Sequence, residues 1–167
     1  MTDFRSILFA ALGSAASAFG GPAAAAPDDM LPMVRFVAYE DALNRGQVDL
    51  ALEQFTDDAT VVAGSMCTAD KPCVGKAAVR AGLLERFIGL NIGVRMREVH
   101  FDGERLRTRM EVVHDLVRRQ GVARIVVTDT IEFRNGKISS LVVKADTSDP
   151  ETARYLQLMA QPQPAKQ

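Results

Sequence analysis

Apolar positions at helical spacing mark the first segment of the chain after residue 30. Between residues 31 and 45, Phe36, Tyr39 and Leu43 recur at steps of three and four residues. Gly46 follows directly, and glycine is the usual residue just past a helix because it tolerates positive φ. The pattern therefore predicts a helix over residues 31–45 with these three side chains on its buried face.

Two more helices and one strand are predicted before residue 90. Asp49 is a candidate N-cap for a short second helix. The segment TDDATVVAG, residues 56–64, predicts a turn that enters a strand. Residues 76–90 then carry an apolar row at helical spacing, interrupted by Gly82, and predict the third helix. The first half of the domain is thus predicted to be mainly helical.

After residue 91 the pattern changes to strands. Segments with alternating apolar and polar positions are separated by Asp-Gly at 102–103 and Asn-Gly at 135–136, which are strong β-hairpin signals. One of these segments, residues 104–117, is predicted as a single strand. The last segment, DPETARYLQLMA, predicts a helix that begins at Asp-Pro, 149–150. Helices first and an antiparallel meander afterwards predict an α+β domain in which a curved sheet folds over its helices.

The first 25 residues have the composition of a secretory signal. Arg5 and the free amine are its positive charges, an apolar stretch follows, and the segment ends in alanines. A disordered Ala-rich tail and an anchor helix are the alternatives, but the stretch is too short and too rich in small residues to span about 30 Å of hydrocarbon well. We expect a signal peptide over residues 1–25, a folded domain over 26–160 and a disordered tail over 161–167. No later apolar run is long enough for a membrane span, so the domain is expected to be periplasmic or secreted.

The two cysteines of the chain, Cys67 and Cys73, lie in a predicted polar loop. Tetrahedral zinc needs four nitrogen or sulfur ligands, and the two histidines, His100 and His114, lie on other predicted elements. We therefore expect no metal and no other cofactor. In an oxidising compartment the two cysteines are expected to form a structural disulfide. A catalytic redox pair is the alternative, but such pairs are more typically Cys-x-x-Cys at the start of a helix.

The net charge and the length of the chain disfavour a nucleic-acid-binding protein and favour a single small domain. The formal net charge is −1, and acidic residues interleave the lysines and arginines along the chain. Nucleic-acid binding is therefore not expected, because it requires a continuous basic surface. About 140 residues remain after signal cleavage, which suits a single domain with one core.

One carboxyl is predicted to lie inside the apolar face of a strand. In RIVVTDTIEF, Ile125, Val127, Ile131 and Phe133 share a face with Asp129 when side chains alternate. Burial disfavours the carboxylate, so the pKa of Asp129 is expected to rise, and a protonated carboxyl can donate a hydrogen bond. The alternative is an aspartate that pairs with an arginine or caps a gap in the backbone hydrogen bonding.

Three stretches resemble the SnoaL-like, nuclear-transport-factor-2-like superfamily. They are YEDALNRGQVDLALEQFTDDATV, the helix after Gly75, and DTIEFRNGKISSLVVKAD, and the resemblance spans roughly Leu31 to Asp146. It implies a cone-shaped α+β barrel: three N-terminal helices packed on a strongly curved, mainly antiparallel sheet, with a short C-terminal helix. The fold implies a pocket between the sheet and the helices but no single reaction, since it hosts isomerases, dehydratases, cyclases, epoxide hydrolases and proteins without catalysis.

Ketosteroid isomerases within this superfamily suggest roles for two residues. These enzymes use a tyrosine from the first helix and a protonated aspartate as hydrogen-bond donors, with a second aspartate as general base. Tyr39 and Asp129 match the two donors, whereas residues 62–64, Val-Ala-Gly, stand where the base would be. The donor pair is matched and the base is not, which disfavours a steroid isomerase. Tyr39 also fits a plain core residue with its hydroxyl at the pocket rim.

Limonene-epoxide hydrolases of the same superfamily use an Asp-Arg-Asp arrangement. Arg109 and Glu111 resemble part of it, but the other aspartate would fall near Val143. Because side chains alternate along a strand and Met110 is expected to face the pocket, Arg109 and Glu111 are expected to face away from it. By strand alternation His114 shares the inward face with Met110, so it is expected near the pocket mouth. The common alternative is a histidine that is exposed or already hydrogen-bonded.

The sequence as a whole predicts an exported domain whose apolar pocket binds a small, largely apolar molecule that carries an oxygen. Tyr39, Asp129 and His114 are the candidate catalytic residues for an isomerase-, cyclase- or dehydratase-type reaction without a cofactor. The base is left open between His114, Glu111 and the substrate itself. The alternative is a non-catalytic ligand-binding or dimerisation module that uses the outer face of the sheet, and a homodimer is expected. Predicted pocket-lining residues are Phe36, Met110, Val127 and Leu141.

Overall fold

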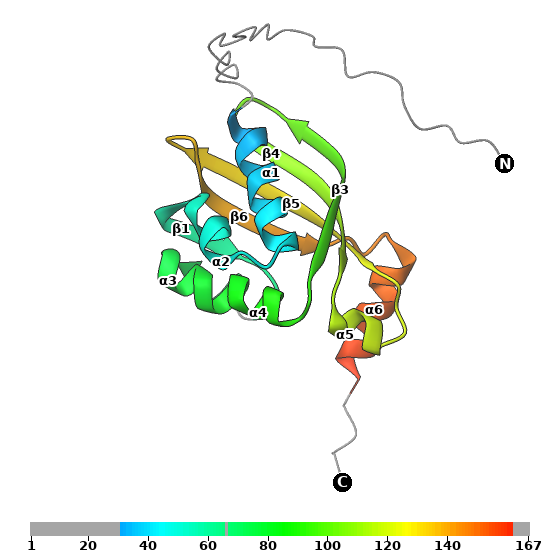
Figure 1. The fold of residues 1–167 in the computed structure, drawn as a ribbon. Helices are drawn as coiled ribbons and strands as arrows, with labels where there is room; N and C mark the ends of the chain where they lie inside the picture. Colours follow the sequence, from blue (N-terminus) through cyan, green and yellow to red (C-terminus); the bar gives the residue numbers. More distant parts are fainter. Residues whose placement is uncertain (1–30, 66, 162–167) are drawn as a thin grey trace, which may run out of the picture.

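A computed structural model describes residues 31–65 and 67–161 (Figure 1). The predicted signal peptide and residues 162–167 of the predicted tail lie outside the described residues. The elements follow in this order: α1 (Leu31–Asn44), α2 (Val48–Glu53), β1 (Phe55–Val62), β2 (Cys73–Val74), α3 (Lys76–Val79), the π-helical turn η2 (Arg80–Leu84), α4 (Glu85–Gly89), β3 (Gly93–Phe101), β4 (Arg105–Val113), α5 (Asp115–Arg119), β5 (Ile125–Arg134), β6 (Lys137–Ala145) and α6 (Pro150–Ala160).

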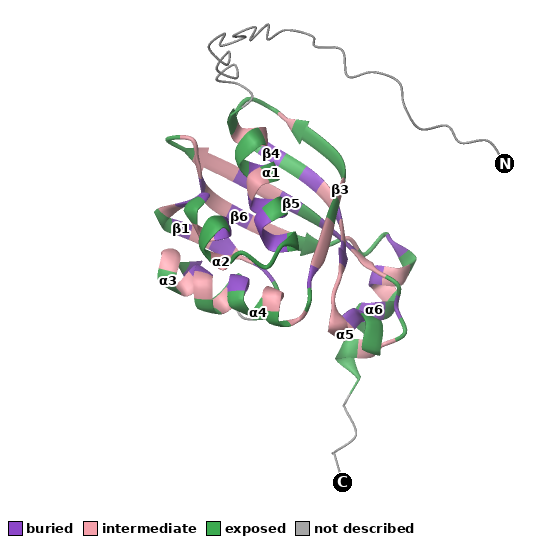
Figure 2. Cartoon of the chain, in the orientation of Figure 1, coloured by how far each residue is buried: buried purple, intermediate pink, exposed green. Residues whose placement is uncertain are grey.

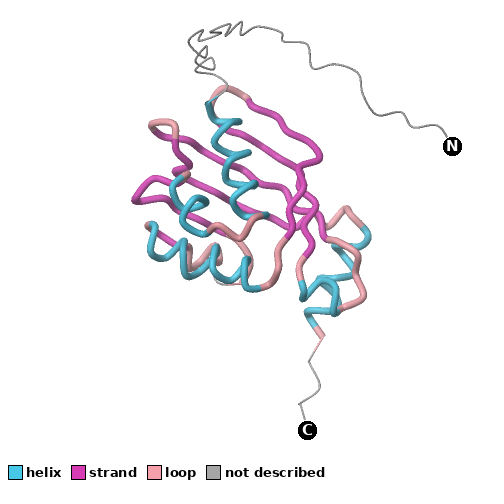
Figure 3. The backbone as a smooth tube through the Cα atoms, in the orientation of Figure 1, coloured by secondary structure: helices cyan, strands magenta, loops and turns pink. Residues whose placement is uncertain are grey.

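The strands form one curved sheet in the order β2-β1-β6-β5-β4-β3 (Figure 1). All neighbouring pairs are antiparallel except β1 and β6, which run parallel. Both predicted hairpins are confirmed, joining β3 to β4 and β5 to β6 (Figure 3). At the second hairpin Asn135 and Gly136 have φ of 52° and 69°, the positive values that a tight two-residue turn requires. The α+β class and the mainly antiparallel sheet are therefore confirmed.

Helix α1 crosses the concave side of the sheet and contacts β3 and β6 (Figure 1). Its C-terminus is fixed to the edge strand by Asn44, which donates to the carbonyl of Val94 over 3.0 Å and accepts from the N–H of Val94 over 2.8 Å. Buried positions concentrate where α1 faces the strands (Figure 2). The sheet and α1 thus form two opposed walls whose relative position is set by specific hydrogen bonds.

At the other end of the sheet, α5 and α6 pack together (Figure 1). Val117, Val122 and Tyr155 form a small apolar cluster of their own there. The first turn of α6 is joined to the sheet through Asp149, which accepts from the N–H of Thr152 over 2.9 Å and pairs with Arg124 over 2.9 Å. The predicted start of this helix at an Asp-Pro pair is confirmed.

Three local predictions are wrong. The strand predicted over residues 104–117 ends at Val113, and α5 follows because His114 caps it: the His114 Nδ1 accepts from the N–H of Val117 over 3.4 Å. Asp49 is not the N-cap of α2; Gln47 holds that position, and the Asp49 carboxylate pairs with Arg80 instead. Strand β1 already begins at residue 55, so the segment expected to be a turn is extended.

The apolar row of the third predicted helix is interrupted at Gly82 because a disulfide packs there. Cys67 and Cys73 form that disulfide. A Cβ built on Gly82 would lie 2.4 Å from the Cys73 Sγ and 3.0 Å from the Cys67 Sγ, closer than non-bonded atoms approach. The helix also widens to a π-helical turn at this point. The glycine therefore makes room for the disulfide against the helix.

Candidate functional site

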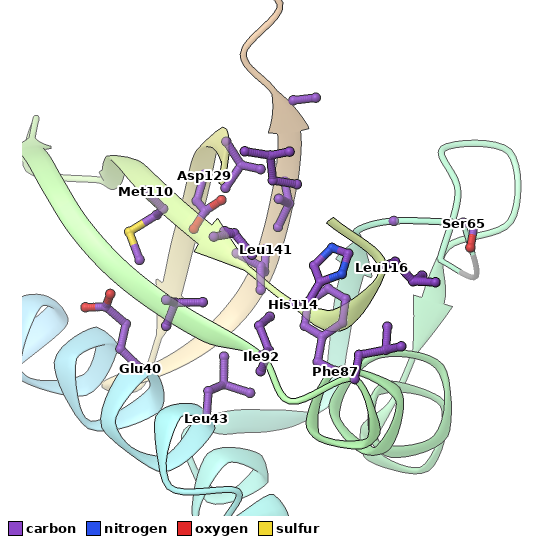
Figure 4. A pocket seen from close by; sticks show the side chains of 18 of the residues that line it. Glu40, Leu43, Ser65, Phe87, Ile92, Met110, His114, Leu116, Asp129 and Leu141 are labelled. Carbon is purple, nitrogen blue, oxygen red and sulfur yellow. The ribbon is translucent and has the colours of Figure 1, made fainter. Parts of the chain in front are cut away.

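A cavity of about 580 Å³ lies between α1 and the concave face of the sheet (Figure 4). Its walls come from α1, α4, β3, β4, β5 and β6, and α5 and α6 contribute the side chains at one end. Apolar groups dominate the lining. The lining includes all four residues predicted for it: Phe36, Met110, Val127 and Leu141. Leu43, Ile92 and Val143 line the cavity as well.

Asp129 lies in the middle of β5 and faces this cavity (Figure 4). Its residue is 7% exposed, and its cross-strand neighbours are Thr108 on β4 and Val143 on β6. The Thr108 hydroxyl donates to Asp129 Oδ2 over 3.4 Å, whereas Asp129 Oδ1 is fully buried and has no hydrogen-bond partner among the described residues. Alternation along the strand predicted this placement, and no arginine pairs with Asp129 in the described part of the chain.

Burial also determines the protonation of Asp129. Desolvation raises its pKa to about 7, helped by the nearby charge of Glu40 and opposed by the hydrogen bond from Thr108. A substantial fraction of the side chain is therefore protonated at neutral pH and can donate a hydrogen bond from within an apolar surface.

Tyr39 lies on α1 and is 5% exposed. Its ring packs between Phe36, at 5.9 Å between centroids, and Phe55, at 5.3 Å in an edge-to-face arrangement. Burial raises the pKa of the phenol, and the charges of Asp129 and Glu40 raise it further. Tyr39 is thus both a core residue and a permanently protonated hydroxyl that lines the cavity.

Glu40 is a cavity residue that the sequence reasoning missed. It lines the same cavity and is 8% exposed (Figure 4). Within residues 31–65 and 67–161 its carboxyl makes no hydrogen bond or ion pair, and desolvation raises its pKa to about 7. A signal was present: Phe36, Glu40 and Leu43 are spaced at i, i+4 and i+7, so they share one helix face.

His114 also lines the cavity, at the end formed by α5 and α6 (Figure 4). Its ring packs edge-to-face on Tyr155, with 6.2 Å between centroids. Burial lowers its pKa, and the charge of Arg118 lowers it further, so the imidazole is neutral above pH 7. The strand alternation predicted above does not explain this position, because His114 is the N-cap of α5 and does not belong to a strand.

Glu111 and Arg109 lie on the opposite, outer face of the sheet. Glu111 pairs with Arg97 over 2.6 Å and with Arg124 over 3.0 Å, and Arg109 pairs with Asp146 over 3.0 Å. Neither residue lines the cavity. Glu111 is therefore not available as a base inside it, and the epoxide-hydrolase arrangement is not formed.

A second hollow of about 340 Å³ adjoins the cavity. The two share Gly64 and Ser65, which precede the disulfide loop, and Phe87, Leu90 and Leu116. This hollow therefore connects the surface beside the disulfide with the end of the main cavity.

Across residues 31–65 and 67–161, no group of three or more His, Cys, Asp or Glu side chains is placed to hold a metal ion. None of the helices in the same residues is long and apolar enough to cross a membrane.

Comparison with known proteins identifies the fold family. The SnoaL-like domain model matches residues 36–141. A search of curated protein sequences finds no match. Among solved structures, an NTF2-like protein of unknown function from Cytophaga hutchinsonii covers 70% of this chain and 91% of its own, with a TM-score of 0.54 and 12% identity.

Two further structures with the same fold are associated with small molecules. SalBIII, an epoxide hydrolase/cyclase-like enzyme of pyran ring formation in the polyether salinomycin, has a TM-score of 0.59 and 20% identity, and the match covers 73% of this chain and 95% of SalBIII. A computationally designed 17-OHP binder has a TM-score of 0.58 and 13% identity, with 71% and 92% covered. At these identities the likeness extends to the fold alone. The chain belongs to the SnoaL-like domain family and shares its fold with the NTF2-like protein from Cytophaga hutchinsonii.

Proposed function

We propose that the cavity binds a small, largely apolar molecule and holds an oxygen of that molecule through Asp129 and Tyr39. The observation that carries this proposal is Asp129 Oδ1, which is buried in an apolar cavity and has no partner among the described residues. Leaving such a group unsatisfied costs about 1–3 kcal/mol. A ligand oxygen at that point would form the missing hydrogen bond.

The arrangement suits a reaction in which negative charge develops on the ligand oxygen. Two protonated groups, the Tyr39 hydroxyl and the Asp129 carboxyl, would stabilise an enolate-like oxygen in a surrounding of low dielectric constant. Glu40 is the buried carboxyl placed to accept a proton, the role that the sequence left open. We therefore propose an isomerase-, cyclase- or dehydratase-type reaction. A cyclase-like enzyme and a designed 17-OHP binder with the same fold support a small-molecule role for the cavity.

The test is mass spectrometry of small molecules that copurify with the domain, comparing wild type with Asp129→Leu. We expect the wild type to retain a ligand that the variant loses. Thr128→Leu is the matched control, because Thr128 is the preceding residue of the strand and is exposed on its other face. Equal retention by wild type and Asp129→Leu would remove Asp129 from the binding site.

The competing proposal is a non-catalytic ligand-binding module. It predicts that the retained molecule is released chemically unchanged after incubation with the protein, whereas an enzyme converts it. The same extraction experiment, carried out before and after incubation, separates the two.

We also propose that the domain is exported and acts as a homodimer. The disulfide supports an oxidising compartment. The outer face of the sheet, where the dimer was expected, carries charged pairs such as Arg105 and Glu132 at 2.8 Å. A dimer through this face should therefore weaken as salt is added, and light scattering at low and high ionic strength measures that directly.

A further inference from the structure

The cavity contains two carboxyl groups and no positive charge to balance them. Asp129 comes from β5 and Glu40 from α1, so they lie on different walls of the cavity (Figure 4). No lysine or arginine occurs among the lining residues in the described part of the chain. An unpaired buried carboxylate is unfavourable, and proteins normally bury acids only with a partner.

The remaining titratable groups around the cavity do not supply that partner. Tyr39 on α1 and Tyr155 on α6 carry no positive charge, and Thr108 on β4 is neutral. His114, at the start of α5, is held uncharged at neutral pH because burial lowers its pKa. The charge of Glu40 therefore acts on Asp129 without compensation from a cation lining the cavity, which contributes to the raised pKa of Asp129.

Two hydrogen-bonding positions are also open. Asp129 Oδ1 is fully buried, nine-tenths of its residue is inaccessible, and it has no partner in residues 31–65 and 67–161. The Glu40 carboxyl makes no hydrogen bond to another of those residues either, but its oxygens, unlike Asp129 Oδ1, are not fully buried. An ammonium group has three donors and one positive charge, so it can donate to Asp129 Oδ1 and to the Glu40 carboxyl and also supply the missing charge.

We infer that the cavity also binds apolar primary amines in their protonated form, with the ammonium held between Glu40 and Asp129 and the apolar body against Leu43, Met110 and Leu141. The inference rests on the proposed function, because it uses the same cavity, and it names a second class of ligand. Carboxylates of the same size are excluded, since they would place a third negative charge beside two acids.

The experiment uses three probes with one ring system: 1-naphthylmethylamine, 1-naphthalenemethanol and 1-naphthoate. They are a cation, a neutral alcohol and an anion of similar size, and isothermal titration calorimetry with the 26–167 domain measures their affinities. At pH 8 the amine is expected to bind at least tenfold more tightly than the alcohol, and the carboxylate more weakly than both. Amine binding at pH 7 should release protons, because the cation favours the ionised carboxyls.

Variants locate the charge effect. Glu40→Gln and Asp129→Asn are close in shape to the wild-type side chains, and each is expected to lower the ratio of amine to alcohol affinity at least tenfold. Glu53→Gln is the control, since Glu53 is exposed on α2 and does not line the cavity. The thermal unfolding of each variant shows whether it is folded, and the alcohol affinity of Glu40→Gln reports the cavity independently of its charge.

The outcomes distinguish the two proposals. Equal affinity for amine and alcohol in the wild type would overturn the amine site and leave the proposed function standing. Binding of the amine alone would support the amine site and contradict the proposed recognition of a neutral oxygen. Absence of binding by both probes would overturn both. An amine preference that survives in both variants would show that the preference arises elsewhere and would also overturn the inference.

Discussion

Individual residues of the cavity show how burial changes the chemistry of an ordinary side chain. Asp129 and Glu40 both have a pKa of about 7, against usual values of 3.8 and 4.5, chiefly because desolvation disfavours their charged forms. Asp129 was predictable because strand alternation alone places it among apolar neighbours. Glu40 is not predictable from the apolar positions alone, although its spacing of four residues from Phe36 places it on the same helix face.

The raised pKa values predict a stability that falls as pH rises. Between about pH 4 and pH 7 the folded protein binds more protons at these two carboxyls than the unfolded chain does. The free energy of unfolding should therefore decrease as pH increases through this range, by roughly 3–4 kcal/mol for each group. Asp129→Asn and Glu40→Gln should each make urea-unfolding free energies less dependent on pH between 5 and 8. Variants whose pH dependence runs parallel to the wild type would contradict these assignments.

At the scale of elements, the helices are positioned by contacts that local sequence patterns describe only in part. The hairpins and the start of α6 were predictable because their turn and cap residues act locally. The short helix α5 was not, since residues 104–117 continue an alternating pattern and its cap is a histidine side chain. The π-helical turn η2 lies against a disulfide from another segment, a contact that no local sequence pattern contains.

The close approach of Gly82 to the disulfide gives a prediction for this helix. Gly82→Ala should lower the free energy of unfolding by about 1–3 kcal/mol, because the added Cβ overlaps the Cys73 Sγ. In the Cys67→Ala/Cys73→Ala background the same substitution should cost much less, so the effects are non-additive. Gly89→Ala is the control on α4, where an added Cβ meets nothing within 4 Å. An equal cost with and without the sulfurs would show that the clash is not the cause.

Asp149 gives a second prediction at this scale. It caps α6 through Thr152 and forms two hydrogen bonds of 2.9 Å with Arg124, which hold its pKa at about 2. Asp149→Ala should destabilise the domain by about 1–3 kcal/mol, because it removes the cap and one of the two carboxylates that pair with Arg124, the other being Glu111. Asp149→Asn can still cap the helix and should lose less. Chemical denaturation at pH 7 measures both, and equal losses would indicate that the charge alone matters.

At the scale of the whole molecule, the family and the α+β architecture followed from the order of helices and hairpins together with short family motifs. The shape of the cavity did not, because its volume depends on how far the sheet curves and on where α5 and α6 close one end. The second hollow was not predictable from the sequence either, because it is lined by residues beside the disulfide together with residues of α4 and α5, which are far apart in the chain. Patterns of buried positions predict faces of elements, whereas the distance between two faces depends on all the contacts between them.

Export is the prediction that belongs to the whole chain. When the full chain is expressed with a functional secretion system, mass spectrometry of the intact protein should show loss of residues 1–25. A thiol-reactive reagent should not label Cys67 or Cys73 until a reductant is added, because the disulfide blocks both sulfurs. If the protein keeps residues 1–25 and its thiols are labelled without a reductant, both the predicted export and the formation of the disulfide in the cell are wrong.

The position of Glu40 and Asp129 on opposite walls has a stereochemical consequence. A flat molecule lying between α1 and the sheet would turn one of its two faces toward the helix and the other toward the strands. A proton removed or delivered by Glu40 would then always pass on the helix side. Any product with a new stereocentre should accordingly be formed as a single enantiomer.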